Sequence, residues 1–328
     1  MTSRRRFLLA LGAAAATPSL VAHAQPAARI PHVGYLSVGS EDTNSAFLSA
    51  FKEGLREFGY VDGKNIVVDV QWAGEAAYQF PQLAASMVKT KPDAIVTTCI
   101  PSTRAAKAAT GTIPLVMSVD GDPVGAGLVT SLARPGANLT GSSTQFEELI
   151  PKWLELLTAV VPGARAIAIL RNPVNLVDPY FWAKFEDAAK RIGVTILPYE
   201  ARVPGDLVGA FAAINRQRAG GLIVMTEAFL AGESARIVPL ADQYKLPGIY
   251  GYREFTEAGG LMSYGLSFRD YFRGVARYVD AVLRGTKPAN LPIEQPTKIE
   301  LVINLATARR LGLTMPPTLL ARADRVIQ

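Results

Sequence analysis

The stretch from His32 to Trp72, HVGYLSVGSEDTNSAFLSAFKEGLREFGYVDGKNIVVDVQW, predicts a strand, a helix and a second strand. HVGYLSV forms the expected first strand. Phe47, Phe51 and Leu55 then recur at helical spacing, and Gly59 ends that pattern. NIVVDVQW is the expected second strand. Strand, helix and strand in this order are typical of a βαβ unit, and therefore of a parallel sheet.

The same alternation continues along the chain and occurs as two series. In the first, further strands are predicted at 93–99 and 113–119, with helices near 80–91 and 101–110 and another beginning near Pro123. In the second, strands are predicted at 164–170, 193–200, 220–226, 246–252 and 259–265, with helices near 147–160, 179–192, 206–215 and 229–244. A long amphipathic helix follows at 268–284, and the tail is expected to hold one more strand and short helices.

Length and composition agree with this arrangement. The chain has 328 residues, 49% of them hydrophobic, which is enough for about two domains. We therefore expect an α/β fold of two Rossmann-like lobes with parallel sheets. The lobes should be joined by short crossings near Thr140 to Phe146 and near Gly260 to Ser267.

The first residues have the pattern of an export signal. Arg4, Arg5 and Arg6 precede an uncharged run from Phe7 to Val21, followed by small residues spaced A-x-A at Ala22 and Ala24. The competing interpretation is a membrane anchor, but the run is shorter than the roughly 20 apolar residues that a span needs. The arginines also fit the twin-arginine export route. We expect a signal peptide at 1–24 and a periplasmic product.

Several classes of chemistry are disfavoured by the residue types present. The chain has two histidines, of which His23 lies in the expected signal, and one cysteine, Cys99. A zinc or copper site, a Ser-His or Cys-His catalytic pair and an internal disulfide are therefore not expected. No G-x-S-x-G elbow, Walker loop or full G-x-G-x-x-G is present. We expect no catalytic residue, no metal and no cofactor.

Nucleic-acid binding is not indicated either. The formal net charge is +6, but basic residues are scattered instead of forming a stripe. A sugar-responsive repressor would share the two-lobed fold, but it needs a helix-turn-helix where this chain has an export signal.

The loop SVDGDPVGAG, from Ser118 to Gly127, carries two aspartates and leaves two interpretations open. Asp120 and Asp122 have the spacing of a possible acid/base pair. Aspartate before a proline is also typical of a residue that caps a turn or a helix start. We favour capping, with at least one of the two carboxylates lining a groove.

Small molecules bind open parallel sheets outside the carboxyl ends of the strands. The chain places polar and aromatic residues after many of its expected strands, and the start of the expected third helix suits a carboxylate. The candidate ligand-binding residues are Ser37, Tyr78, Thr98, Ser102, Thr103, Asp120, Asn172, Asn175, Glu227, Phe229, Tyr250 and Arg253. Tyr252, Tyr180, Phe181 and Trp182 are further candidates for aromatic walls.

Four ordered stretches carry a family resemblance: FKEGLREFGYVDGKNI, GDPVGAGLVTSLARPGANLTG, YREFTEAGGLMSYG and EQPTKIELVINLATARRLGLTMPPTLLARADRVI. Together they cover most of the chain after the signal. The chain resembles the ABC transporter substrate-binding proteins of the tryptophan/tyrosine-binding-like type, which have the type I periplasmic binding protein fold. At Arg171 to Trp182 the chain reads RNPVNLVDPYFW, which departs from the N-P-x-N-P pattern expected of the family.

The resemblance implies two lobes joined by a multi-strand hinge. On that basis we assign residues 30–142 with about 266–291 to an N-terminal lobe, and 143–265 with about 292–328 to a C-terminal lobe. It also implies a monomer that captures a small carboxylate-bearing, aromatic or amino-acid ligand and delivers it to an ABC permease in the inner membrane. An exported enzyme using Asp120 and Asp122, and a ligand-sensing module for a membrane receptor, are the alternatives.

Overall fold

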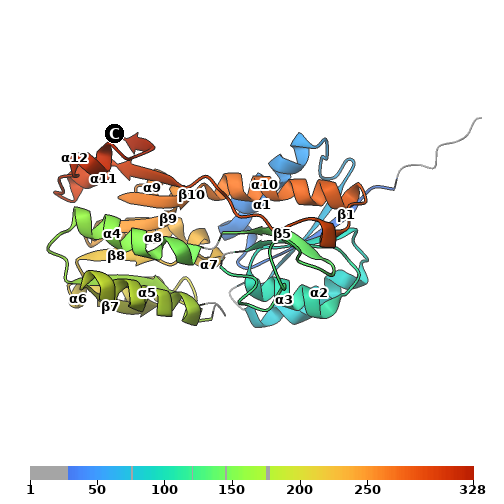
Figure 1. The fold of residues 1–328 in the computed structure, drawn as a ribbon, viewed down its shortest axis with the longest axis horizontal. Helices are drawn as coiled ribbons and strands as arrows, with labels where there is room; N and C mark the ends of the chain where they lie inside the picture. The colour runs from blue at the N-terminus through green and yellow to red at the C-terminus, as the bar shows by residue number, and fades with distance from the viewer. Residues whose placement is uncertain (1–28, 75–76, 120, 145, 175–177) are drawn as a thin grey trace, which may run out of the picture. The chain divides into compact units, whose positions relative to one another are not determined.

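Two sheets organise the chain, and each belongs to its own lobe (Figure 1). The computed structural model describes residues 29–74, 77–119, 121–144, 146–174 and 178–328, and all that follows concerns these residues. The first sheet consists of β1 (His32–Ser37), β2 (Val67–Trp72), β3 (Ala94–Thr97), β4 (Leu115–Val119) and β5 (Leu139–Ser143), in the order β2-β1-β3-β4-β5. Its neighbouring strands are parallel.

The second sheet is also built mainly from parallel strands. It consists of β6 (Ala166–Arg171), β7 (Thr195–Glu200), β8 (Gly221–Val224), β9 (Gly248–Tyr252), β10 (Met262–Leu266), β11 (Glu300–Asn304) and β12 (Arg325–Ile327), in the order β12-β11-β10-β9-β8-β6-β7. Only the pairing of β10 with β11 is antiparallel within this described sheet. The predicted fold class, α/β with parallel sheets in two lobes, is confirmed.

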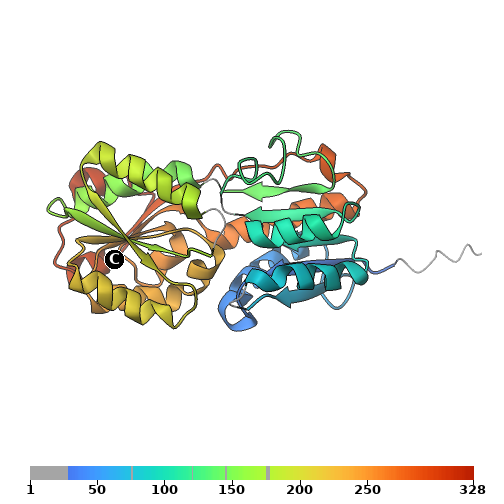
Figure 2. The ribbon, with the colours of Figure 1, turned by 90° about the horizontal axis from the view of Figure 1, so that it is seen from below.

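Helices cover both faces of the first sheet because its strands are apolar on both sides. Val33 and Tyr35 of β1 face α1 (Glu41–Glu57) and α10 (Phe268–Leu283), whereas Leu36 of β1 and Met117 of β4 face α2 (Phe80–Lys89) and α3 (Ile100–Ala109). All four of these strand side chains are fully buried. Figure 2 shows α2 and α3 side by side along this sheet.

The helix α10 reaches the first lobe from a distant part of the sequence. It follows β10 of the second sheet, yet it packs along α1 (Figure 1). Its apolar stripe, which includes Phe272, Val275 and Val279, is buried in this contact. The two helices approach so closely at Gly54 that a Cβ atom there would lie 2.1 Å from the carbonyl oxygen of Arg273. One face of the first sheet is therefore completed by a segment that comes after the second lobe.

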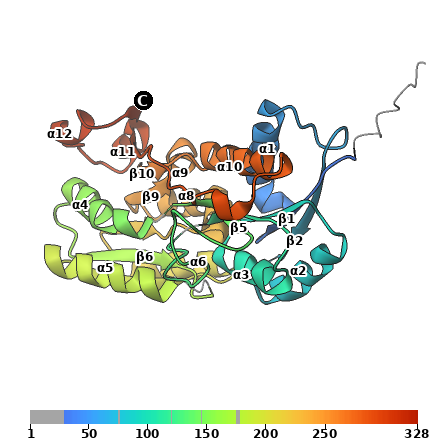
Figure 3. The same ribbon diagram turned by 45° about the vertical axis from the view of Figure 1, so that its right-hand side comes forward.

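Helices also cover the second sheet. In Figure 2, α4 (Ile150–Val160) and α5 (Asp178–Ile192) lie on one face, and α6 (Asp206–Arg216) lies on the other with α8 (Ser234–Gln243). The chain ends with α11 (Leu305–Arg310), α12 (Pro317–Leu320) and β12 (Figure 3). Trp153 of α4 is fully buried and donates its indole N–H to the carbonyl oxygen of Tyr264 at 2.6 Å.

The described chain changes lobe after β5, after β10 and again before β11. Between the last two changes, residues 291–294 return along the first sheet, where the amide of Glu294 donates to the carbonyl oxygen of Gly141 at 3.2 Å and Ser143 donates its amide to Glu294. These passages correspond to the expected multi-strand hinge. The residue ranges assigned to the lobes stay a prediction.

Several predicted elements differ from the structure. The residues expected to cross near Thr140 instead include β5, because they pair in parallel with β4 before the chain leaves the sheet. The helix expected from 229 to 244 divides into α7 (Ala228–Gly232) and α8. The tail holds two strands, β11 and β12, where one was expected.

Substitution of Gly54 by alanine tests the docking of α10 on α1. We expect Gly54→Ala to lower the free energy of unfolding by about 1–3 kcal/mol, because the added methyl group would meet the backbone of Arg273. The matched control is Gly209→Ala in α6, where a Cβ would meet nothing within 4 Å. That change should raise stability by about 0.5–1 kcal/mol through helix propensity. Urea unfolding followed by circular dichroism measures both, and equal effects would contradict the docking.

Candidate functional site

The carboxyl ends of β1 and β3 are joined by a pair of hydroxyl groups. Ser37 is the last residue of β1, and Thr98 directly follows β3. The hydroxyl of Thr98 donates to Oγ of Ser37 at 2.9 Å, and Ser37 donates to the carbonyl oxygen of Val38 at 3.1 Å. Both side chains are buried. The structure therefore brings these two predicted residues together at the edge where ligands approach parallel sheets.

The beginning of α3 adjoins this edge. The hydroxyl of Ser102 accepts from the amide of Cys99 at 3.2 Å and donates to its carbonyl oxygen at 2.9 Å. Thr103 donates to the same carbonyl oxygen at 2.9 Å, and its hydroxyl lies 2.7 Å from that of Thr97. These buried hydroxyls hold the turn in shape. The N-terminal end of α3 lies at this edge of the sheet, and the helix dipole there favours a negative charge.

Two further buried polar residues of this region, Asn44 and Ser118, are not among the predicted ligand-binding residues. Asn44, in the first turn of α1, donates from Nδ2 to the carbonyl oxygen of Val38 at 2.9 Å. Its Oδ1 accepts no hydrogen bond from the described residues, and the same holds for Oγ of Ser118 near the end of β4. Asn44 lies in the polar segment that follows the first strand, close to the predicted residue Ser37. Nothing in the pattern distinguished Ser118 from an ordinary strand residue.

The loop after β4 is a turn, not the start of a helix. Oδ1 of Asp122 accepts from the amide of Val124 at 2.8 Å, and the amide of Ala126 donates to the carbonyl oxygen of Asp122 at 2.9 Å. Asp122 therefore caps a turn, as expected, while the helix predicted near Pro123 is absent from this described loop. The reason is that successive turns up to Gly127, which has a positive φ of 69°, cannot extend into a helix. Asp120 lies outside the described residues.

The corresponding edge of the second sheet carries an amide and a carboxylate. Oδ1 of Asn172 accepts from the amide of Val174 at 3.1 Å. Glu227 follows β8 and caps α7, with Oε1 accepting from the amide of Leu230 at 2.6 Å. Its side chain is only 7% exposed. Asn175 lies outside the described residues.

Three predicted residues are buried in the interior or bonded where the chain changes lobe. Phe229 is 7% exposed and belongs to the core. Tyr250 is fully buried and stacks on Phe255 with ring centroids 4.7 Å apart, and this burial raises the pKa of its phenol. Arg253 hydrogen-bonds to Glu300 and Ser267 where the chain changes lobe. The sequence predicted the end of β9 correctly. It did not predict which neighbouring elements would bury Tyr250 and bond to Arg253.

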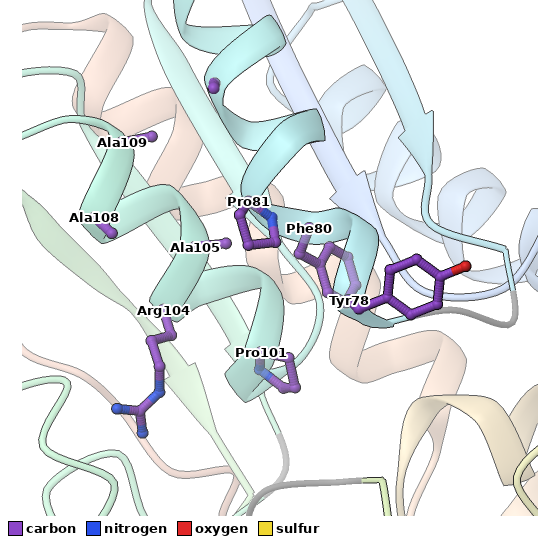
Figure 4. A pocket seen from close by; sticks show the side chains of 9 residues that line it. Tyr78, Phe80, Pro81, Pro101, Arg104, Ala105, Ala108 and Ala109 are labelled. Atoms are coloured by element: carbon purple, nitrogen blue, oxygen red, sulfur yellow. The ribbon is translucent and has the colours of Figure 1, made fainter.

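Tyr78 remains accessible, with 83% of its surface exposed. It belongs to the short helix η1 (Ala77–Gln79) and lies beside a cavity of about 450 Å³ between α2 and α3. Figure 4 shows its ring at the end of this cavity near Phe80, with Arg104 on the α3 side. The cavity walls are mostly apolar, including Pro81, Pro101 and several alanines.

The other aromatic candidates divide between core and surface. Phe181 is buried, Tyr180 is exposed, and Tyr252 is buried against Phe146 and Phe268. The guanidinium of Arg171 lies 5.0 Å from the ring centroid of Trp182. Among the described residues, no three His, Cys, Asp or Glu side chains gather as metal ligands would.

Comparison with known proteins now adds to this geometry. A family model described as "ABC transporter substrate binding protein" matches residues 33–327. The chain belongs to this family. The family resemblance predicted from the sequence is thus confirmed, and the family consists of substrate-binding proteins, not enzymes.

Individual relatives are similar to this chain along most of its length. The tyrosine-binding protein of Clostridioides difficile (strain R20291) is 27% identical over 263 residues, which are 80% of this chain and 75% of the relative. A conserved domain protein from Vibrio cholerae is 28% identical with a TM-score of 0.82, covering 91% of this chain and 100% of the other. The ABC domain from Streptococcus pneumonia in complex with L-Trp is 24% identical with a TM-score of 0.80, covering 90% and 99%.

Replacement of Thr98 by valine tests the hydroxyl pair at the edge of the first sheet. We expect Thr98→Val to lower the free energy of unfolding by about 1 kcal/mol, because a buried hydrogen bond to Ser37 is lost. The control is Thr158→Val in α4, whose half-buried hydroxyl bonds only to carbonyl oxygens of its own helix. Urea unfolding should show a smaller loss for the control. Equal losses would mean that the Ser37–Thr98 bond contributes nothing specific.

Proposed function

We propose that this protein is the periplasmic solute-binding component of an ABC importer. In this proposal it holds a small carboxylate-bearing ligand, an amino acid with an aromatic side chain, between its lobes and delivers it to a membrane permease. The observation that carries the proposal is the family match over residues 33–327, joined to polar groups at the carboxyl edges of both sheets. We further propose that it works as a monomer.

The first lobe supplies the anion-binding part of the proposed site. The N-terminal end of α3 and the hydroxyls of Ser37 and Thr98 lie at one edge of the first sheet. Backbone N–H groups at a helix N-terminus favour a carboxylate. Exposed Tyr78 is a candidate to contact the aromatic part of the ligand.

The second lobe supplies the proposed acceptor for the ammonium group. Glu227 places a carboxylate at the end of β8, held in position by its bond to the amide of Leu230. Asn172 lies at the end of the neighbouring β6. Asp120 stays a second candidate acceptor. The names of the relatives, a tyrosine-binding protein and a complex with L-Trp, support an aromatic amino acid as ligand.

Ligand capture requires contacts from both lobes. A ligand shifts a conformational equilibrium only by its differential affinity for the two states. A carboxylate bound by the first lobe and an ammonium group bound by the second provide that difference, because both contacts form only in a closed arrangement.

The location of the protein is part of the proposal. We infer export by the segment of residues 1–24, with the twin-arginine route as the expected path. None of the described helices combines the length and apolar character needed to cross a bilayer.

A thermal-shift screen tests the ligand class. We expect L-tyrosine or L-tryptophan to raise the melting temperature, because a ligand that binds only the native state stabilises it by mass action. Tryptamine lacks the carboxylate and indole-3-propionate lacks the ammonium group, so both should give smaller shifts. Mass spectrometry should recover the bound amino acid unchanged. Conversion of the ligand, or no shift with any aromatic amino acid, would contradict the proposal.

Substitution of Glu227 by glutamine tests the ammonium site. A hydrogen bond to a charged group contributes about 1.5–3 kcal/mol, so Glu227→Gln should weaken binding of the preferred amino acid roughly 10- to 100-fold. Glutamine can still accept from Leu230, so the cap of α7 is kept. Glu233→Gln is the control, since Glu233 is also buried and pairs with Arg236 at the other end of α7. Calorimetric titration showing the same loss for both variants would remove Glu227 from the site.

A further inference from the structure

The N-terminus of α10 is capped by residues from both lobes. Ser267 accepts from the amide of Asp270 at 3.1 Å, as an N-cap residue does. Glu254 is in α9 (Arg253–Glu257), which directly follows β9 of the second sheet. Its Oε1 accepts from the amide of Arg269 at 2.9 Å and from the hydroxyl of Ser267 at 3.1 Å. A carboxylate of the second lobe thus stabilises the positive end of a helix that packs in the first lobe.

Arg253 links the same helix end to the later passage between the lobes. Its Nη2 donates to Oγ of Ser267 at 3.0 Å and lies 3.7 Å from the carboxylate of Asp270. Its Nη1 donates to Glu300, the first residue of β11, at 3.1 Å. The side chain is 21% exposed, so these contacts are partly shielded from water. The guanidinium of Arg253 therefore connects the end of β9 to two passages between the lobes. One passage leads from β10 into α10, and the other leads into β11.

These charges persist at neutral pH. A hydrogen bond from Lys298 lowers the pKa of Glu300, and Arg253 adds to this effect. Burial opposes the charge of Arg253, but the hydrogen bond that Arg253 donates to Glu300 and the nearby carboxylates of Glu257 and Glu254 outweigh this effect and raise the pKa of Arg253. A neighbouring cavity of about 210 Å³, lined in part by Asp270, Pro296 and Lys298, separates the two passages.

Aromatic rings from different passages meet close to these charges. Tyr252, at the end of β9, contacts Phe146 with ring centroids 5.0 Å apart and Phe268 at 4.5 Å, both nearly perpendicular. Phe268 in turn contacts Phe47 of α1 at 3.8 Å. Phe146 lies just after the first passage between the lobes, which follows β5. Phe268 lies just after the second passage, which follows β10. The rings form a continuous apolar contact from the second sheet to α1.

We propose that Arg253, Glu254, Ser267, Asp270 and Glu300 form a hinge clasp that limits the lobe arrangements open to the ligand-free protein. The clasp acts on α10, a helix of 16 residues attached to α1, so the direction of its N-terminus sets the direction of the first lobe. Arg253 and Glu254 are positioning residues that make no contact with ligand. This inference does not depend on the identity of the ligand.

The consequence for binding follows from populations. If the clasp is broken, the ligand-free protein occupies more arrangements, and the fraction competent to bind falls. The apparent dissociation constant rises by the same factor as that fraction falls. Charge-assisted hydrogen bonds are the strongest of those lost, so a change of about tenfold in the ratio of arrangements is expected.

The direct test measures distances between the lobes without ligand. Spin labels at Lys89→Cys in α2 and Lys190→Cys in α5, both exposed, in a Cys99→Ala background, report the distance distribution by double electron–electron resonance. Arg253→Met keeps the apolar stem, and Glu254→Ala removes the cap. Each should broaden the distribution, with about a tenfold gain in the ratio of minor to major arrangements. Arg253→Lys should give an intermediate result.

Glu53→Gln is the matched control. It weakens a contact of 2.8 Å between Glu53 and Arg269, the residue next to Asp270 on α10, but both side chains belong to the first lobe. Its distribution should match that of the parent. If Arg253→Met or Glu254→Ala fails to fold by circular dichroism, Arg253→Lys and Glu254→Gln carry the same comparison. Folded clasp variants with parental distributions, or a control that broadens equally, would overturn the proposal.

A second measurement separates this inference from the proposed function. Calorimetric titration with L-tyrosine and with L-tryptophan should show about tenfold weaker binding by Arg253→Met, while the ligand-bound distance distribution stays parental. If neither amino acid binds the parent, the proposed ligand class fails but the ligand-free comparison still decides the clasp. If binding is unchanged in a variant with a broadened distribution, the clasp does not control affinity and that part of the inference is wrong.

Discussion

The contact between α10 and α1 is the constraint on which the rest of the structure depends. The first sheet is apolar on both faces, and one of them is completed only when α10 returns from the second lobe. Burial of the apolar stripe of α10 drives this helix to pack on the first lobe. Because the chain must then enter the second sheet again at β11, the lobes are joined by several passages. A hinge of this kind follows from how the core is completed, and at Gly54 the two helices leave no room for a Cβ atom.

Parallel strands place their carboxyl ends at one edge, and this determines where polar residues gather. At the edge of the first sheet these residues satisfy one another: Thr98 with Ser37, and Ser102 and Thr103 with Cys99. Buried polar groups must be paired, so most of the predicted side chains stabilise the loops that surround the site. In the proposed function, such loops offer a ligand oriented backbone groups and the N-terminus of a helix, in addition to individual side chains such as Glu227.

At the hinge, polar groups are also paired, and here the partners come from different lobes. The first amides of α10 lack partners within the helix, and Glu254 supplies one from the second lobe. Aromatic contact around Tyr252 provides a buried apolar layer nearby, while the charged clasp is partly exposed. Directional bonds and non-directional packing thus lie side by side at this joint between the lobes, which suits the closure that the proposed function requires.

The sequence by itself determined the α/β class, the two series of strands and helices, and the resemblance to substrate-binding proteins, because periodicity and ordered motifs are local properties. It also predicted correctly that Asp122 caps a turn and that Ser37 and Thr98 lie at strand ends. Only the tertiary structure decided that β5 joins the first sheet, that Tyr250 faces the core, and that Arg253 belongs to the hinge. The physical reason is that pairing partners and burial depend on segments that are not neighbours in the sequence: β5 needs β4 beside it, and Arg253 needs Glu300, which follows it 47 residues later.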